Sequence, residues 1–292
     1  MVQRQTILIT GANGQSGSEF KRLAASYPAY KFIFSAKEEF NITDRDSVKN
    51  FFHLSPPSFC INCAAYTAVD KAETEIDEAY LVNSTAVEIL ATVCKEYNTG
   101  FIHISTDYVF DGTASVPYTE ETKTNPVSVY GKSKLEGEKK VIAANPDSII
   151  IRTAWVYSQF GRNFVKTMLR LMSEKPEINV VNDQVGSTTY AADLAEVIME
   201  IIFSGNWVPG IFHFTNQGII SWFDFASAIN ELTFSACKIN PIDTSQYPTP
   251  ARRPAYSVLD SGKISATYNI RLRGWKESLE RCLTRIKDQE GA

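Results

Sequence analysis

Short apolar runs alternate with stretches of helical periodicity along the first half of the chain. We expect strands over Thr6–Thr10, Tyr30–Ser35, Phe59–Cys63, Phe101–Ser105 and Ser148–Arg152. Helical spacing of apolar residues fills the intervals, over 16–26, 44–54, a long stretch that ends near Cys94, and 129–144. Strands that are almost continuously apolar are typical of a parallel sheet covered on both faces. The alternation therefore predicts an α/β fold, a Rossmann-type doubly wound parallel sheet.

The alternation becomes less regular after about residue 155. We expect helices over Asn163–Ser173 and Ala191–Phe203, and strands over Glu177–Val181 and Gly210–Phe214. The segment Ile239–Pro254 is rich in Pro and Thr, and we expect it to be irregular.

No linker-like stretch separates the two halves, so we expect a smaller α/β substrate lobe that is interleaved with the sheet domain. The expected dinucleotide-binding domain comprises residues 1–155 plus about 178–215. The expected substrate-binding lobe comprises about 156–177 and 216–292.

Composition narrows the possible classes of protein. A chain of 292 residues with 44% hydrophobic residues can bury a large core without disulfides, so its five cysteines are expected to be free thiols. A net charge of −4 argues against nucleic acid and membrane surfaces as partners. No apolar run approaches the ~18–20 residues of a membrane span. The start of the chain resembles no targeting segment, so the expected location is the cytoplasm.

A glycine-rich segment, Gly11-Ala-Asn-Gly-Gln-Ser-Gly17, directly follows the first predicted strand and leads into the first predicted helix. Glycines there allow a tight turn, a close approach of the backbone to a pyrophosphate, and close packing of the helix. The start of the helix would face the anion. We therefore expect a dinucleotide to bind here. The residues expected to contact it are Gly11, Asn13, Gly14, Gln15, Ser16 and Gly17.

The end of the second predicted strand is relevant to the choice between NADPH and NADH. An acid in this position would repel a 2′-phosphate, but the chain has Ser35 and Lys37, which could accept one. The sequence therefore favours NADPH, with NADH as the alternative.

Tyr130 and Lys134 lie four residues apart at the start of a predicted helix, and so on one helical face. A lysine ammonium beside a phenol lowers the phenol pKa and helps it to exchange a proton near neutrality. Thr106 ends the fourth predicted strand, at the edge of the sheet where α/β folds bind ligands. The three residues together predict proton transfer next to a bound dinucleotide.

At this point the chain resembles the extended short-chain dehydrogenase/reductases, and among them the dTDP-4-dehydrorhamnose reductase family. The resemblance spans nearly the whole chain. Its segments are Gly11–Gly17, Asn62–Glu73, Ser105-Thr-Asp-Tyr-Val-Phe-Asp-Gly112, Val129–Leu135, Arg152-Thr-Ala-Trp-Val-Tyr157, Asn182–Gly186 and Thr249-Pro-Ala-Arg-Arg-Pro254. The Ser105–Gly112 and Arg152–Tyr157 segments are specific to that family, whereas the glycine segment and the Tyr–Lys pair belong to the wider superfamily.

The resemblance implies NADPH-dependent reduction of the C4 ketone of dTDP-4-dehydro-β-L-rhamnose, the last step in making dTDP-β-L-rhamnose. Tyr130 would donate the proton, Thr106 would hydrogen-bond to the same oxygen, and Lys134 would also bind the nicotinamide ribose. Further cofactor contacts implied by the family are Asn41, Ile42, Ala64, Ala65 and Tyr66. Implied substrate contacts are Thr106, Asp107, Tyr108, Trp155, Asn163, Gln184 and Arg253, with Lys166 as a further candidate.

The resemblance also bears on metal binding and on assembly. Some family members bind Mg²⁺ between subunits, and Glu19 matches one of their acids, but Ala192 stands where another acid is expected. We therefore expect no metal site, and a monomer or a homodimer. Two other functions stay open: a different nucleotide-sugar 4-ketoreductase, and a non-catalytic NADP-binding regulatory subunit of S-adenosylmethionine synthase.

Overall fold

A six-stranded sheet forms the centre of the computed structural model, which describes residues 4–290. Its strands are β1 (Thr6–Thr10), β2 (Lys31–Ser35), β3 (Phe59–Asn62), β4 (Gly100–Thr106), β5 (Ile149–Thr153) and β10 (Gly210–His213). They lie in the order β10-β5-β4-β3-β1-β2, and every neighbouring pair is parallel. The predicted doubly wound parallel sheet is confirmed, and so are its strands.

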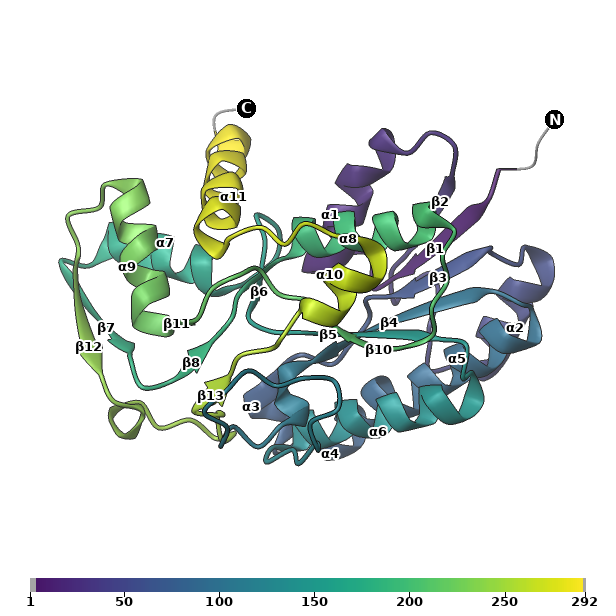
Figure 1. Ribbon diagram of the computed structural model, residues 1–292, viewed down its shortest axis with the longest axis horizontal. Coiled ribbons are helices and arrows are strands. Elements are labelled where there is room, and N and C mark those ends of the chain that lie inside the picture. The colour runs from purple at the N-terminus through teal and green to yellow at the C-terminus, as the bar shows by residue number, and fades with distance from the viewer. Residues whose placement is uncertain (1–3, 291–292) are drawn as a thin grey trace.

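Helices cover both faces of this sheet (Figure 1). One layer contains α1 (Gln15–Leu23), α8 (Ala191–Ser204) and α10 (Gly262–Tyr268), and the other contains α2 (Arg45–Leu54), α5 (Ala86–Glu96) and α6 (Val129–Ala144). Successive residues of a strand point to opposite faces. In β1, Ile7 and Ile9 accordingly pack with the first layer and Leu8 packs with the second. This two-sided burial explains the unbroken apolar runs of the sequence.

The strand order also determines where a ligand can bind. From β1 the chain crosses to β2 on one side and then returns to β3 on the other, so the order reverses between β1 and β3. In open α/β sheets, ligands bind at the carboxyl ends of the strands at such a reversal. The chain after β3 forms α3 (Val69–Ala72), α4 (Ile76–Tyr80) and a π-helical turn (Leu81–Thr85) before α5.

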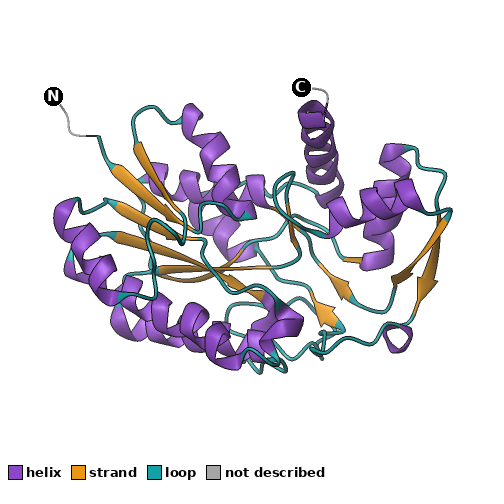
Figure 2. Cartoon of the chain, turned by 180° about the vertical axis from the view of Figure 1, so that it is seen from behind, coloured by secondary structure: helices purple, strands orange, loops and turns teal. Residues whose placement is uncertain are grey.

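A second lobe lies beside the sheet domain (Figure 2). Its helices are α7 (Phe164–Glu174), α9 (Trp222–Thr233) and α11 (Trp275–Glu290). Its strand pairs are β7 (Glu177–Val181) with β12 (Lys238–Ile242), and β6 (Val156–Tyr157) with β9 (Thr189–Tyr190). A small sheet joins β11 (Ile220–Ser221), β8 (Val185–Gly186) and β13 (Tyr256–Ser257). The lobe has a hydrophobic core of its own, which includes Val165, Phe225 and Leu279.

The structure corrects the expectation of an irregular segment over Ile239–Pro254. Residues 238–242 form β12, which pairs in parallel with β7. Pro241 is compatible with this strand because β12 has a neighbour on one side only, so the missing N–H can face away from the pairing. Beyond β12 the segment contains one 3₁₀ turn (Thr244–Gln246) and is otherwise irregular.

The packing of β7 bears on the extent of the lobe. Ile178 and Val180 of β7 and Tyr190 of β9 belong to the core of the second lobe, whereas Leu194 of α8 belongs to that of the sheet domain. We therefore propose that residues 178–190 belong to the lobe, and that the sheet domain resumes near residue 191. Within residues 4–290, no helix has both the length and the apolar character that a membrane span requires.

Candidate active site

A cavity of about 860 Å³ lies at the carboxyl ends of β1, β3 and β4, where the strand order reverses. Five segments of the sheet domain form most of its wall: the glycine segment, residues 36–43, residues 63–69, residues 104–108 and the start of α6. Trp155 and Trp222 contribute from the side of the second lobe. The cavity thus lies between the two units, with access to groups from both.

The glycine segment forms a close-fitting turn at one end of this cavity. Gly11 has φ +64°, and a Cβ atom on it would lie 2.6 Å from the backbone nitrogen of Ala64. A Cβ atom on Gly17 would lie 2.5 Å from the carbonyl oxygen of Gly11, so Gly17 allows α1 to pack on the turn. Gly14 precedes α1 and offers no side chain to cap it, which leaves N–H groups at the helix start for an anion.

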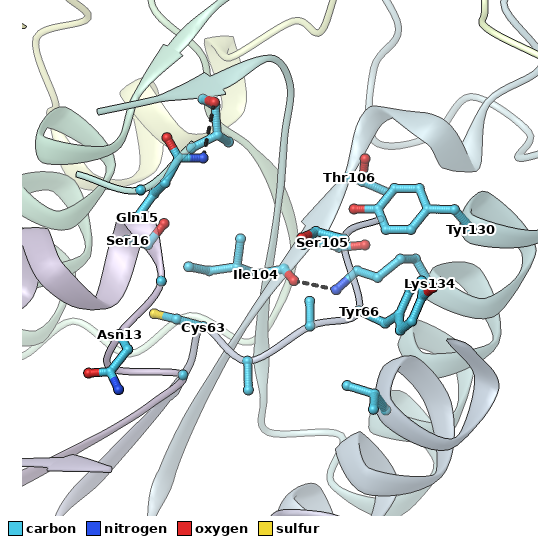
Figure 3. Close-up of a pocket in the computed structure, with 18 of the residues that line it drawn as sticks. Asn13, Gln15, Ser16, Cys63, Tyr66, Ile104, Ser105, Thr106, Tyr130 and Lys134 are labelled. Atoms are coloured by element: carbon cyan, nitrogen blue, oxygen red, sulfur yellow. Dashed lines mark hydrogen bonds between the residues drawn. The ribbon is translucent and has the colours of Figure 1, made fainter. Parts of the chain in front are cut away.

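Asn13, Gln15 and Ser16 line the same end of the cavity, on the side opposite Tyr130 and Lys134 (Figure 3). Lys37, Asn41 and Ile42 line it next to the carboxyl end of β2. The Asn41 carboxamide oxygen accepts hydrogen bonds from the backbone and hydroxyl of Thr43, at 3.1 and 2.8 Å. The oxygen of the Asn41 side chain is thus engaged within the protein, and its NH₂ group can donate a hydrogen bond. Two expected contacts, Gly17 and Ser35, do not line the cavity: Gly17 packs within the turn, and Ser35 is buried at the end of β2.

Ala64, Ala65 and Tyr66 follow β3 and line the cavity. The side chain of Asn83 holds this loop by two hydrogen bonds to the Tyr66 backbone, accepting from its N–H at 2.9 Å and donating to its carbonyl at 3.1 Å. Asn83 is fully buried in the π-helical turn. No sequence signal indicated this role, because the two residues meet only after the chain has folded back.

Thr106, Tyr130 and Lys134 meet at the wall of the cavity opposite the glycine segment (Figure 3). Thr106 ends β4, and Tyr130 and Lys134 occupy successive turns of α6. The helix starts at a fixed point because the Ser128 hydroxyl accepts a hydrogen bond from the backbone N–H of Gly131. A Cβ atom on Gly131 would lie 2.2 Å from the Tyr108 carbonyl oxygen, so only glycine allows α6 to approach the end of β4 this closely.

The sequence predicts that Lys134 lowers the pKa of Tyr130, but in the free protein the pKa of Tyr130 is raised. Burial raises the pKa of Tyr130 to about 12, and hydrogen bonding with Thr106 opposes this shift. The Lys134 side-chain nitrogen is not among the groups that shift the pKa of this phenol. It donates a 2.7 Å hydrogen bond to the carbonyl oxygen of Ile104. Tyr130 is therefore a protonated phenol, the form that can give a proton to a developing oxyanion.

The wall of the cavity near Thr106 is aromatic and includes the carboxyl group of Asp107. Trp155 stacks on Trp222 with ring centroids 3.5 Å apart and planes 9° apart. Trp155 adopts φ +46°, a strained conformation for a large side chain, which is often associated with function. Asp107 is buried, one of its carboxylate oxygens has no partner, and burial raises its pKa to about 6.

Three expected substrate contacts lie outside the cavity wall. Asn163 caps α7 by accepting from the Lys166 backbone N–H at 3.1 Å, and its amide donates to Gln15 at 3.0 Å. Gln184 donates to the Thr244 hydroxyl at 3.0 Å. Arg253 forms an ion pair with Asp70 at 2.7 Å, and its other terminal nitrogen, Nη1, is buried without a partner.

Glu19 does not fit a metal ion. Its carboxylate is fully buried and accepts hydrogen bonds from Ser158 at 2.7 Å and Arg22 at 3.1 Å, so it is not exposed at the surface, where a metal shared between subunits would bind. In the part of the chain that the structure describes, no three His, Cys, Asp or Glu side chains are placed to hold a metal together. All five cysteines are free thiols, and Cys63 lies at the cavity wall.

The cavity wall also includes residues that lie outside the sequence motifs. Trp222 faces Trp155, Glu78 and Val82 approach from α4 and the π-helical turn, and Arg162 lies at the edge next to α7. Trp222 is far from every motif in the sequence, so only the packing of α9 brings it to the site.

The chain is similar in sequence and in structure to a group of known proteins. Residues 5–288 match the family described as the RmlD substrate binding domain. The dTDP-4-dehydrorhamnose reductase of Sinorhizobium fredii is 44% identical over 284 residues, covering 94% of this chain and 95% of its own. A crystal structure of a dTDP-4-dehydrorhamnose reductase from Clostridium acetobutylicum has 43% identity and a TM-score of 0.93, with 97% of this chain and 100% of its own covered. A second, from Bacillus anthracis in complex with NADP, has 36% identity and a TM-score of 0.92, with coverage of 97% and 100%.

Proposed function

Because the chain belongs to the RmlD substrate binding domain family, we propose that it is a dTDP-4-dehydrorhamnose reductase. It reduces the C4 ketone of dTDP-4-dehydro-β-L-rhamnose with NADPH and releases dTDP-β-L-rhamnose. The observation that carries this proposal is the meeting of Thr106, Tyr130 and Lys134 at one wall of the cavity that the glycine segment forms.

The cavity fits a dinucleotide. Gly11 and Gly17 leave space where any side chain would collide with backbone, and the uncapped start of α1 offers N–H groups to a pyrophosphate. The contacts proposed for the rest of the cofactor are Asn13, Gln15, Ser16, Lys37, Asn41, Ile42, Ala64, Ala65, Tyr66, Tyr130 and Lys134, all of which line the cavity. Lys37 is an exposed cation near the end of β2, in a 3.7 Å ion pair with the exposed Glu78. Its charge favours NADPH over NADH because it can bind a 2′-phosphate. The related Bacillus anthracis structure holds NADP, which supports the same choice.

NADPH, when bound, supplies a hydride to the ketone carbon. Negative charge then develops on the ketone oxygen, and the Tyr130 phenol gives its proton to that oxygen. The Thr106 hydroxyl hydrogen-bonds to the same oxygen and so holds the ketone in place. Lys134 holds the nicotinamide ribose and stabilises the phenolate that Tyr130 becomes.

The substrate contacts are proposed on two sides of the reacting group. Asp107, Tyr108 and Trp155 line the cavity next to Thr106. Arg253 has a buried, unpartnered guanidinium nitrogen, and its charge acts on the Tyr108 hydroxyl, so it is placed to reach a substrate phosphate. Asn163 and Gln184 are weaker candidates because other residues occupy their amide groups.

Two other functions suit the sequence less well. A regulatory subunit that binds NADP without turnover would have no use for Thr106, Tyr130 and Lys134 together at the cavity. Another nucleotide-sugar 4-ketoreductase would share all three residues, so the product itself must decide between the two reductases. The cytoplasmic location and the monomeric or homodimeric state stay predictions from the sequence.

The test is oxidation of NADPH, followed at 340 nm, with dTDP-4-dehydro-β-L-rhamnose as the substrate and NADH as the comparison. NMR of the product then gives the configuration at C4. Turnover to dTDP-β-L-rhamnose with preference for NADPH is the expected result. No turnover, together with stoichiometric capture of an S-adenosylmethionine synthase, would instead favour the regulatory role.

A further inference from the structure

A line of buried polar side chains runs from β1 to Lys134, and its hydrogen bonds have a fixed direction. It begins at Thr10, the last residue of β1, and continues to Asn62, the last residue of β3; both are buried. The Asn62 carboxamide oxygen accepts from the Thr10 hydroxyl at 2.6 Å and from the backbone N–H of Ala64 at 3.2 Å. A backbone N–H can only donate, so this contact settles which end of the carboxamide is oxygen.

The orientation of Asn62 then determines the tautomer of His103. The Asn62 amide nitrogen lies 3.0 Å from Nδ1 of His103, and an amide NH₂ group can only donate. Nδ1 is therefore the acceptor and carries no proton. Burial strongly lowers the pKa of His103, so the ring is neutral and its single proton is on Nε2.

Nε2 of His103 lies 3.3 Å from the Lys134 nitrogen. Both side chains are almost completely buried, so no bulk water separates them. A charged ammonium at this position would place two donors against each other. An uncharged amine has a lone pair that can accept the Nε2 proton, and it can still donate to the Ile104 carbonyl oxygen at 2.7 Å.

We propose that His103 is a positioning residue that lowers the proton affinity of Lys134 in the cofactor-free protein, so that dinucleotide binding is coupled to proton uptake at Lys134. The step is uptake of one proton from solvent by the Lys134 amine, which becomes an ammonium. The ribose hydroxyls and phosphates of the dinucleotide supply the acceptors and the negative charge that make the ammonium favourable. This inference rests on the proposed function, because it assumes that a nicotinamide dinucleotide binds in the cavity.

The other titratable groups around Lys134 offset only part of the lowering of its pKa. Glu138, one turn further along α6, and Cys63, after β3, both raise the pKa of Lys134, yet burial dominates and lowers it to about 8. Tyr130, one turn earlier, is a neutral phenol. Glu138 is itself held by Arg152 at 2.6 Å, which reduces its influence on Lys134. The neighbouring groups therefore do not raise the pKa of Lys134 back to the usual value for a lysine.

The first measurement is isothermal titration calorimetry of the whole protein with NADPH, in buffers that differ in ionisation enthalpy. The dependence of the observed heat on the buffer gives the number of protons taken up. We expect uptake to be small at pH 7 and to rise toward one proton per NADPH at pH 9, because the pKa of free Lys134 is about 8. NADPH binding without proton uptake at pH 9 would overturn the inference but not the proposed function. If NADPH does not bind, the proposed function itself fails.

Asn62→Asp is the informative variant, because it keeps the shape of the side chain and replaces the amide donor with a carboxylate, which accepts a hydrogen bond and also adds a negative charge that favours the Lys134 ammonium. His103 would then carry its proton on Nδ1 and present a lone pair to Lys134, which would be charged before NADPH arrives. The proton uptake at pH 9 is expected to fall, although burial still lowers the pKa of Lys134. Thr10→Val is the matched control, since the Ala64 N–H still orients Asn62, and it is expected to keep the uptake.

A second measurement needs no variant and no cofactor. The chain has three histidines, so long-range ¹H–¹⁵N spectra of labelled protein resolve their tautomers with few signals to assign. The proposal requires that His103 be neutral and protonated on Nε2. A His103 ring protonated on Nδ1, or on both nitrogens, would overturn it, even if Asn62→Asp fails to fold.

Discussion

Arg152 and Glu138 form a two-point ion pair inside the protein, with contacts of 2.9 and 2.6 Å between the guanidinium group and the two carboxylate oxygens. Arg152 comes from β5 and Glu138 from α6, and both are almost fully buried. The pair therefore joins the helix that presents Tyr130 and Lys134 to the sheet beneath it. The Ser105 hydroxyl adds a third contact to Glu138, at 2.5 Å.

Arg152→Leu is expected to destabilise the protein by about 3–5 kcal/mol, because removing one partner leaves the other charge buried and unpaired. Urea unfolding followed by circular dichroism measures the change. Arg170→Leu is the control, since its ion pair with Glu174 is exposed and pairs of that kind contribute about 0–1 kcal/mol. Equal losses in the two variants would contradict the structural role of the buried pair.

Tyr130→Phe is expected to lower turnover by about 10²–10⁴-fold, the usual size for a positioned proton donor. The substitution removes only the hydroxyl, so NADPH affinity should change little. Steady-state kinetics and a fluorescence titration of NADPH together make the measurement. Tyr247→Phe, at an exposed position, serves as the control. Near-normal turnover by the Tyr130 variant would exclude the proposed proton donor.

Gly11→Ala is expected to weaken NADPH binding at least about tenfold, for which a loss of 1.4 kcal/mol is sufficient. The new methyl group would lie 2.6 Å from the Ala64 nitrogen, and both backbone segments contact the cavity. Gly205→Ala is a close match, because Gly205 also has positive φ but has open space around its Cβ position. That control should lose a little thermal stability and keep its NADPH affinity. Equal affinities in the two variants would argue against the glycine segment as the dinucleotide site.

Arg253→Gln is expected to raise KM for the nucleotide sugar about tenfold or more, since hydrogen bonds to charged groups contribute about 1.5–3 kcal/mol. NADPH affinity should stay unchanged, because Arg253 does not line the cavity in which the cofactor is proposed to bind. Its neighbour in the chain provides the control: Arg252 is exposed, and Arg252→Gln should leave KM unaltered. A parallel loss of NADPH affinity in the Arg253 variant would indicate a general disturbance of the loop.

Asp107 gives the stability of the free protein a distinct pH dependence. Burial raises the pKa of Asp107 to about 6 from 3.8, so the folded state holds the proton more tightly than the unfolded state does. The free energy of unfolding should therefore fall as pH rises from about 4 to about 6. Asp107→Asn removes this dependence and should stabilise the protein at pH 8 by up to about 3 kcal/mol. Unfolding at pH 3.5 and pH 8 tests the sign, since the gain should vanish at the lower pH.

The sheet and the proposed reacting residues could be predicted from the sequence because their signals are local. An apolar run such as Thr6–Thr10 indicates a strand buried on both faces, and the glycine segment after it indicates a dinucleotide turn. The four-residue spacing of Tyr130 and Lys134 places them on one helical face whatever the rest of the chain does. By contrast, β12 was missed because its proline is acceptable only on a strand with one neighbour, and pairing is not visible in local sequence.

The sequence by itself determined which elements form the sheet and which side chains are the candidates for the chemistry. Only the tertiary structure decided their ionisation and their partners. Lys134 contacts Ile104 and His103 rather than the Tyr130 phenol, and Trp222 reaches the cavity from a helix remote from every motif. The reason is physical: a periodic pattern reports the environment of a residue along its own helix or strand, whereas burial and hydrogen-bond direction depend on segments that meet only in the folded chain.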